Sequence, residues 1–133
     1  MEKVAFVFPG QGSQYVGMGR DLYETYPEAR ALFDEADGIL GFPLSKLCFE
    51  GPKEELDDTI NTQPAIFTTS IACLKALNLL FSLNPLFCAG HSMGEYTALV
   101  AAGALDFAYA LKLVRERGRL MKEAGEQIGR AHV

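Results

Sequence analysis

The chain has 133 residues, of which 49% are hydrophobic and 22% charged, so it can bury one sizeable core but hardly two. A net charge of -5 and the lack of any run of lysine and arginine argue against a nucleic-acid surface. Cys48, Cys73 and Cys88 have no paired or metal-ligand spacing, which is typical of reduced thiols. With no leader or membrane-length apolar run, we expect one domain, or a piece of one, in a cytoplasmic protein.

The first predicted element is a strand over residues 4–8, an apolar run typical of a strand buried on both faces of a parallel sheet. The glycine-rich segment 10–14 follows at the carboxyl end of this strand, where open α/β sheets bind ligands. It lacks the third glycine of the dinucleotide fingerprint, because Tyr15 occupies that place. Its backbone amides can instead supply one donor of an oxyanion hole; the alternative is an ordinary turn with Ser13 as a cap.

Helices are predicted over the next part of the chain. Pro27 opens a helix whose apolar residues recur at helical spacing as far as Gly41. A short helical turn over 42–50 and a charged surface segment over 51–58 are expected next, without functional signs. Pro64 is expected at the first position of a long apolar helix.

The most informative stretch is Gly-His-Ser-Met-Gly at residues 90–94. It lies between an apolar run at 86–89, which predicts a second buried strand, and a small-residue helix over 96–102. This order is typical of a nucleophile elbow, a strained and closely packed turn that has no room for side chains at its two glycines. Ser92 would face the free N–H groups of the helix, whereas we expect His91 to be packed and hydrogen-bonded rather than the base. The alternative is a plain Gly-Ser turn.

A last helix is predicted from Phe107 to about Ala124, capped by Asp106. Arg117 falls in the middle of its apolar face, where a permanently charged guanidinium is costly to bury without an anion. Two interpretations stay open: an internal ion pair, for example with Glu95 or Asp106, or a cleft in which the anion arrives with a substrate. The apolar face comprises Ala110, Leu113, Val114, Leu120 and Met121.

The order strand, helices, strand, helix, helix predicts an α/β fold with parallel strands flanked by helices. Two strands do not make a stable sheet of this kind, because parallel sheets are larger and covered on both faces. We therefore expect that part of the fold lies outside this chain.

Four motifs together resemble those of the bacterial malonyl-CoA:acyl carrier protein transacylases of fatty-acid synthesis. They are Gly-Gln-Gly-Ser-Gln at 10–14, Thr-Gln-Pro-Ala at 62–65, Gly-His-Ser-Met-Gly-Glu at 90–95 and Arg-Gly at 117–118. The resemblance, which runs from Met1 to about Glu126, implies that residues 1–127 are the N-terminal part of an α/β-hydrolase-like large subdomain. It also implies that the ferredoxin-like small subdomain of the family is absent from this chain.

Carried over position by position, the resemblance implies that Ser92 is the nucleophile and that the backbone N–H groups of Gln11 and Met93 form the oxyanion hole. Arg117 would bind the malonyl carboxylate, and Gln63 lies near the site in the family. The implied reaction has two steps: malonyl-CoA acylates the serine and CoA leaves, then the phosphopantetheine thiol of acyl carrier protein takes the malonyl group. The implied partners are malonyl-CoA and acyl carrier protein, with no metal or redox cofactor, no nucleic acid and no membrane.

The chain departs from the family in one respect that matters for chemistry. A serine nucleophile needs a base, and the family's catalytic histidine has no counterpart here. Residues 128–133, which include His132, fit neither the family pattern nor a helix, and we interpret them as a non-native tail. The chain alone is therefore expected to be incomplete and inactive. The competing interpretations are an α/β-hydrolase-type serine esterase, which has no use for Arg117, and a non-catalytic fragment that binds a carrier protein.

Overall fold

The fold was obtained as a computed structural model, which describes residues 3–127 of the chain. Among these residues there are two strands, β1 (Ala5–Phe8) and β2 (Phe87–Gly90), and seven helices. The helices are α1 (Arg20–Thr25), α2 (Pro27–Leu40), α3 (Leu44–Glu50), α4 (Lys53–Leu56), α5 (Thr59–Leu80), α6 (Gly94–Ala101) and α7 (Phe107–Gln127).

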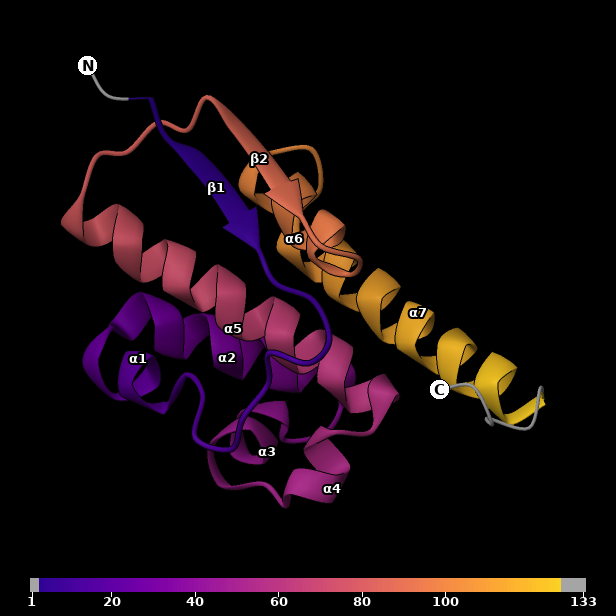
Figure 1. Cartoon of the computed structure of the whole chain (residues 1–133). Helices are drawn as coiled ribbons and strands as arrows, with labels where there is room; N and C mark the ends of the chain where they lie inside the picture. Colours follow the sequence, from indigo (N-terminus) through magenta and orange to yellow (C-terminus); the bar gives the residue numbers. More distant parts are fainter. Residues whose placement is uncertain (1–2, 128–133) are drawn as a thin grey trace.

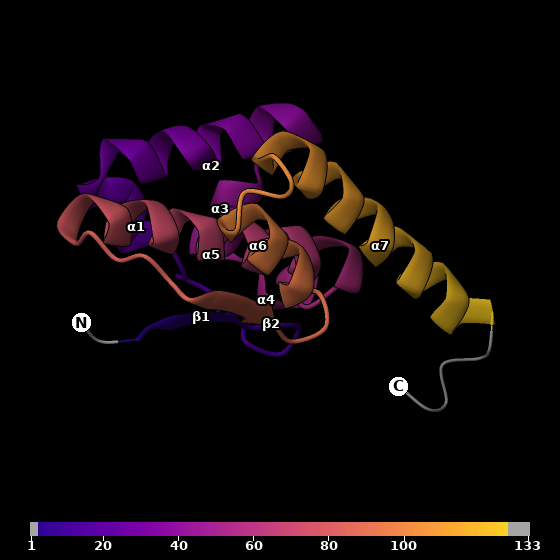
Figure 2. The same ribbon diagram turned by 90° about the horizontal axis from the view of Figure 1, so that it is seen from above.

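The two strands lie side by side and parallel, with Phe8 opposite Gly90 (Figure 1). Their carboxyl ends therefore meet at one edge of the sheet, and the segments that follow them are neighbours. In the view of Figure 2 the described helices lie on one side of the strands. The predicted α/β class with a parallel sheet is confirmed.

The predictions that the first strand is buried on both faces and that the second strand is buried are wrong for the described chain. Val7 is 74% exposed and Phe87 61% exposed, and Phe8 is the only buried strand residue in this part of the protein. The reason is that each strand has a single neighbour within residues 3–127, and the helices there cover one face (Figure 2). An apolar hollow of about 620 Å³ also lies open between β1 and α5. The strand composition suits a larger sheet than this chain builds.

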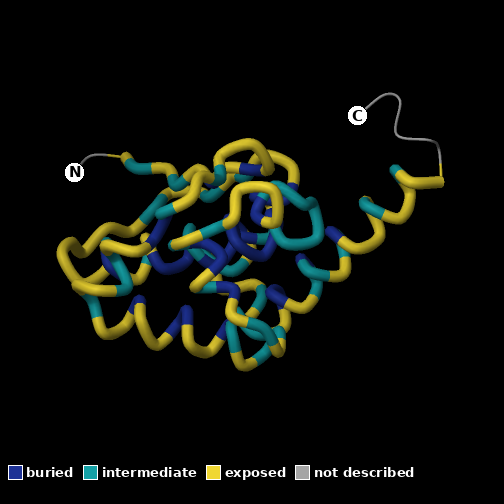
Figure 3. Tube along the Cα trace, turned by 90° about the horizontal axis from the view of Figure 1, so that it is seen from below, coloured by how far each residue is buried: buried dark blue, intermediate teal, exposed yellow. Residues whose placement is uncertain are grey.

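The core lies mainly between helices, as the dark tube segments of Figure 3 show. Its largest fully buried apolar side chains include Phe33 of α2, Leu44 of α3, Phe67 of α5 and Leu111 of α7. Every residue of α5 from 62 to 68 is buried, so this helix is surrounded by neighbours rather than amphipathic. The position of α5 at the centre brings the beginning of this helix close to several other elements.

The predicted helix at Pro27 is confirmed, since α2 ends at Leu40 and Gly41 follows in the left-handed conformation with φ 76°. The short turn predicted over 42–50 corresponds to α3. Helix α1 was not predicted: it is six residues long, and its N-cap, Gly19, offers no side chain to cap it. Neither apolar periodicity nor a capping residue therefore marked it in the sequence.

The expected start of the long helix at Pro64 is wrong, because α5 begins at Thr59 and Asp58 caps it by accepting a hydrogen bond from the N–H of Ile60. Pro64 thus lies inside the helix, where it has no N–H to donate to the carbonyl of Ile60. Arg115 of α7 takes over that acceptor, since its Nη1 lies 2.8 Å from the Ile60 oxygen. A contact between two helices compensates for the hydrogen bond that proline removes.

Helix α7 begins as predicted, with Asp106 Oδ1 accepting a hydrogen bond from the N–H of Tyr109 at 2.8 Å. It continues past the expected end, to Gln127, and its C-terminal half extends away from the body of the molecule (Figures 1 and 3). Leu120 and Met121, predicted on the apolar face, are about half exposed for that reason. The buried face of α7 instead includes Leu111 and Gly118.

No helix of the described chain combines the length and the apolar character needed to span a membrane. Residues 3–127 also hold no group of three or more histidine, cysteine or acidic side chains arranged to bind a metal ion. The cysteines are free thiols, and burial raises the pKa of Cys48 to about 12.

Candidate active site

Ser92 stands in the sharp turn between β2 and α6. Its φ of 55° is the only positive value at a non-glycine residue in the described chain, and such a conformation costs about 1–2 kcal/mol. Strain of this kind persists where the surroundings impose it, and it gathers at functional sites. A Cβ atom at position 90 would overlap the backbone of Gly94, and one at position 94 would overlap the carbonyl oxygen of Phe8. The steric demand predicted for both glycines is therefore present, which favours an elbow over a plain turn.

The loop after β1 lies directly against this elbow. A Cβ atom on Gly10 would be 2.5 Å from the carbonyl oxygen of His91, so the two backbones are in close contact. The backbone N–H groups of Gln11 and Met93 donate to no acceptor among residues 3–127. Two free N–H groups near a serine hydroxyl are what an oxyanion hole requires.

Arg117 connects α7 with both the elbow and α5. Its Nη2 donates to Ser92 Oγ at 3.1 Å, and its Nη1 donates to Gln63 Oε1 at 2.8 Å. None of the four ion pairs found in the described chain includes this guanidinium. The internal ion pair with Glu95 or Asp106, one of the two interpretations above, is therefore not formed there. A positive charge with neutral partners lies beside the serine, where an incoming anion can meet it.

Gln63 is fully buried and orients Arg117. Its Nε2 donates to the sulfur of Met121 at 3.2 Å, which leaves Oε1 to face the guanidinium. The ring of Tyr96 adds a second contact, with its centroid 6.0 Å from the guanidinium carbon of Arg117. Tyr96 could not be selected from the sequence, because an aromatic residue in a small-residue helix has the same pattern as a core residue.

The structure joins three of the residues selected from the sequence, because Arg117 donates hydrogen bonds to Gln63 and Ser92. Met93 follows Ser92 in the chain, and Gln11 follows Gly10, whose backbone contacts that of His91. The expectation for His91 is wrong, since its side chain is exposed and has no hydrogen-bond partner within the described residues. His91 lies at the end of the strand pair, where the backbone of Gly10 occupies the space beside it. His132 falls outside the described residues, as does the whole of the tail predicted at 128–133.

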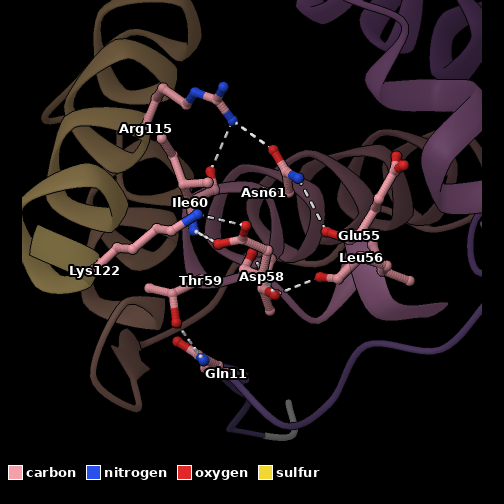
Figure 4. A network of polar contacts seen from close by, with 10 residues as sticks. Gln11, Glu55, Leu56, Asp58, Thr59, Ile60, Asn61, Arg115 and Lys122 are labelled. Carbon is pink, nitrogen blue, oxygen red and sulfur yellow. Dashed lines mark hydrogen bonds and ion pairs between the residues drawn. The ribbon is translucent and has the colours of Figure 1, made fainter. Parts of the chain in front are cut away.

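A polar network joins the beginning of α5 to α7 (Figure 4). Arg115 Nη1 donates to Asn61 Oδ1 as well as to the Ile60 carbonyl, both at 2.8 Å, and Lys122 Nζ pairs with Asp58 Oδ2 at 2.7 Å. Burial lowers the pKa of Arg115, and the charge of Asp58 opposes that shift. The network anchors α7 on both sides of Arg117 and so limits where that side chain can lie.

Gly118 sets the separation of α5 and α7. A Cβ atom at this position would lie 2.9 Å from the carbonyl oxygen of Thr59 and 3.0 Å from Ile60 Cα. We expect Gly118→Ala to lower the free energy of unfolding by about 1 kcal/mol, because the overlap outweighs the better helix propensity of alanine. On the same helix, a Cβ atom at Gly125 meets no atom within 4 Å, so Gly125→Ala should raise the free energy of unfolding by about 0.5–1 kcal/mol. Urea unfolding of both variants measures the difference; equal effects would contradict a close approach at residue 118.

Comparison with known proteins gives a consistent picture. The family model described as acyl transferase domain matches residues 5–133. A malonyl CoA-acyl carrier protein transacylase of Bacillus subtilis (strain 168) is 58% identical over 124 residues, covering 93% of this chain and 39% of the relative. The protein of that name in Escherichia coli (strain K12) is 49% identical, with coverage of 93% and 40%. The chain therefore spans about 40% of the length of these two curated relatives.

Solved structures show the same likeness. The malonyl CoA-acyl carrier protein transacylase of Clostridium perfringens superposes with a TM-score of 0.87 at 42% identity, covering 92% of this chain and 39% of that one. A malonyl-transacylase in complex with its type II PKS acyl-carrier protein has a TM-score of 0.88 at 46% identity, with coverage of 92% and 40%.

Proposed function

We propose, from the premise that this chain belongs to the acyl transferase domain family, that it forms the N-terminal part of an acyl carrier protein S-malonyltransferase. The whole enzyme would transfer a malonyl group from malonyl-CoA to the phosphopantetheine thiol of acyl carrier protein. The observation that supports the proposal best concerns Arg117. Its guanidinium has no carboxylate partner in the described chain and donates a hydrogen bond to Ser92 Oγ at 3.1 Å.

The size of the malonyl group explains why this distance matters. Its free carboxylate and its thioester carbon are separated by two carbon–carbon bonds of about 1.5 Å each. A cation that binds the carboxylate must therefore lie close to the nucleophile that attacks the thioester. Arg117 meets this condition, and its planar fork suits two hydrogen bonds to one carboxylate.

In the proposed first step, Ser92 Oγ attacks the thioester carbon, and the N–H groups of Gln11 and Met93 stabilise the negative oxygen that forms. The carboxylate takes the hydrogen bond that Arg117 otherwise gives to Ser92, which leaves the serine oxygen available for attack. CoA leaves as its thiol, and a malonyl ester of Ser92 remains. In the second step the carrier thiol attacks this ester and restores the serine.

The base for these steps is proposed to come from the part of the relatives that this chain does not span. The described residues would then be the beginning of an α/β-hydrolase-like large subdomain, and the ferredoxin-like small subdomain would belong to the remainder. We place the enzyme in the cytoplasm and assign no metal or redox cofactor to it. A neutral-ester esterase suits the site less well, because such a substrate gives Arg117 no anion to bind.

Acylation of Ser92 tests the proposal. We define the completed enzyme as residues 1–127 of this chain joined to the remaining C-terminal part of the Bacillus subtilis relative. Mixed with malonyl-CoA, it should gain one malonyl group on Ser92, detected by mass spectrometry. The 133-residue chain alone should react about 1,000-fold more slowly, because general base assistance is missing.

The Ser92→Ala variant of the completed enzyme is the control and should remain unlabelled. Failure of the completed enzyme to acylate, or transfer of the acyl group to water rather than to a carrier thiol, would contradict the proposed function. Rapid acylation of the isolated chain would show instead that no residue beyond this chain is needed.

A further inference from the structure

Two side-chain hydrogen bonds fasten the loop at residues 10–14 to Asp57, which follows α4, and to Thr59, the first residue of α5. Gln11 Nε2 donates to Thr59 Oγ1 at 2.9 Å, a contact visible in Figure 4, and Gln14 Nε2 donates to Asp57 Oδ1 at 3.0 Å. Residues 51–58 were predicted to be a charged surface segment without function. The structure instead places its end against a loop of the candidate site.

This loop has few other restraints. Gln11, Gly12 and Ser13 are exposed, and Gly12 adopts a φ of 112° that glycine takes easily. Within the loop, the N–H of Gly12 donates to Gln14 Oε1 at 2.8 Å and the N–H of Ser13 donates to the Gly10 carbonyl at 3.3 Å. Exposed segments with few apolar contacts open at low cost, whereas an oxyanion donor must be held to within a few tenths of an ångström. The fixed position of the Gln11 N–H group must therefore come from the hydrogen bonds that join this loop to Asp57 and Thr59.

Thr59 contacts two different elements of the candidate site. It is the first residue of α5, and its side chain accepts the hydrogen bond from the Gln11 amide. Its backbone carbonyl lies on the other side, against Gly118, the neighbour of Arg117 on α7. One residue therefore contacts both the loop with the oxyanion donor and the helix with the carboxylate-binding cation.

We propose that Thr59 is a positioning residue that holds the Gln11 N–H group in place, with Asp57 as the second attachment point through Gln14. This inference rests on the proposed function, in which that N–H group stabilises the oxyanion. The hydrogen bonds of Lys53 and Gln14 both lower the pKa of Asp57, so its carboxylate is ionised and accepts hydrogen bonds at neutral pH. Neither tie involves a group that touches the substrate.

Amide hydrogen exchange of the 133-residue chain, followed by NMR, tests the fastening. Thr59→Val keeps the shape of the side chain but removes the acceptor, and the Gly12 and Ser13 amides should exchange about fivefold faster, as expected for one lost hydrogen bond. Thr59→Ser restores the hydroxyl and should bring exchange back to near the parent rate. Thr25→Val, on the exposed end of α1, is the matched control and should change neither amide.

A second variant keeps the test decisive if Thr59→Val weakens the whole fold. Gln11→Met removes the same hydrogen bond from the exposed loop side and should give the same acceleration. The double variant should be no faster than either single one, because both changes delete one interaction. Unchanged exchange in Gln11→Met, or accelerations that multiply in the double variant, would overturn the proposal.

The outcome is independent of acyl transfer. If exchange behaves as expected but the completed enzyme fails to acylate Ser92, the proposed function is wrong and the fastening stands. If the completed enzyme acylates but exchange is unchanged, the proposed function stands and Thr59 has no positioning role.

Discussion

Replacing Arg117 with alanine in the completed enzyme should lower kcat/KM for malonyl-CoA by about 100-fold and leave transfer from acetyl-CoA nearly unchanged. Two charge-assisted hydrogen bonds to the malonyl carboxylate are lost, which together are worth about 3 kcal/mol, or about two powers of ten. Acetyl-CoA has no carboxylate and loses nothing. Initial rates with the two thioesters, measured with the same carrier protein, give the selectivity directly.

Two further variants separate the fork of Arg117 from a positive charge in general. Arg117→Lys keeps the charge but gives up the paired geometry, and it should recover part of the lost selectivity. Arg115→Ala removes a guanidinium from the same helix, but one already bound to the Ile60 carbonyl and Asn61. It should lower stability and leave the malonyl-to-acetyl ratio intact. An unchanged ratio in Arg117→Ala would refute the role proposed for this residue.

Gly90→Ala should lower the free energy of unfolding of the chain by about 3 kcal/mol. The new methyl group would overlap the backbone of Gly94, and backbone cannot rotate away as a flexible side chain can. The elbow would have to open, and Gly94, which packs against the end of β1, would be displaced with it. Urea denaturation of the parent and the variant gives the difference in stability.

Gly38 of α2 provides the control, because a Cβ atom there meets nothing within 4 Å. Gly38→Ala should stabilise the chain by about 0.5–1 kcal/mol through better helix propensity. The two substitutions are chemically identical and differ in what surrounds them. A Gly90→Ala variant as stable as the parent would mean that the turn around Ser92 is not closely packed.

Local patterns in the sequence predicted much of the site. The spacing of the glycines at 90 and 94 around Ser92 predicted the elbow, because that turn depends on which side chains its own backbone can tolerate. The α/β order, the start and end of α2 and the cap at Asp106 were likewise readable, since each depends on residues a few positions apart. The tail interpretation at 128–133 lies outside the described residues and stays a prediction, and the family match includes those positions.

Contacts between distant segments could not be read in this way. The charge on Arg117 left both an internal ion pair and a substrate cleft open, until the position of α7 against α5 and the elbow gave it Gln63 and Ser92 as partners. Pro64 was predicted to be the first residue of a helix, where its missing N–H costs nothing. Inside the helix that missing N–H is compensated by Arg115, which binds the Ile60 carbonyl and lies 51 positions further along the chain than Pro64. Burial of the strands was overpredicted, because it depends on neighbours that residues 3–127 do not include.

The sequence by itself determined the chemistry available to this protein: a serine in a turn that demands glycines, free backbone amides near it, and a permanent cation on a helix. Only the tertiary structure decided that Arg117 meets Ser92 and that Thr59 and Asp57 accept hydrogen bonds from the loop at residues 10–14. The physical reason is the separation along the chain over which each kind of interaction acts. Steric and capping rules act over one to four residues, whereas the hydrogen bonds that assemble the site join residues 25 to 54 positions apart.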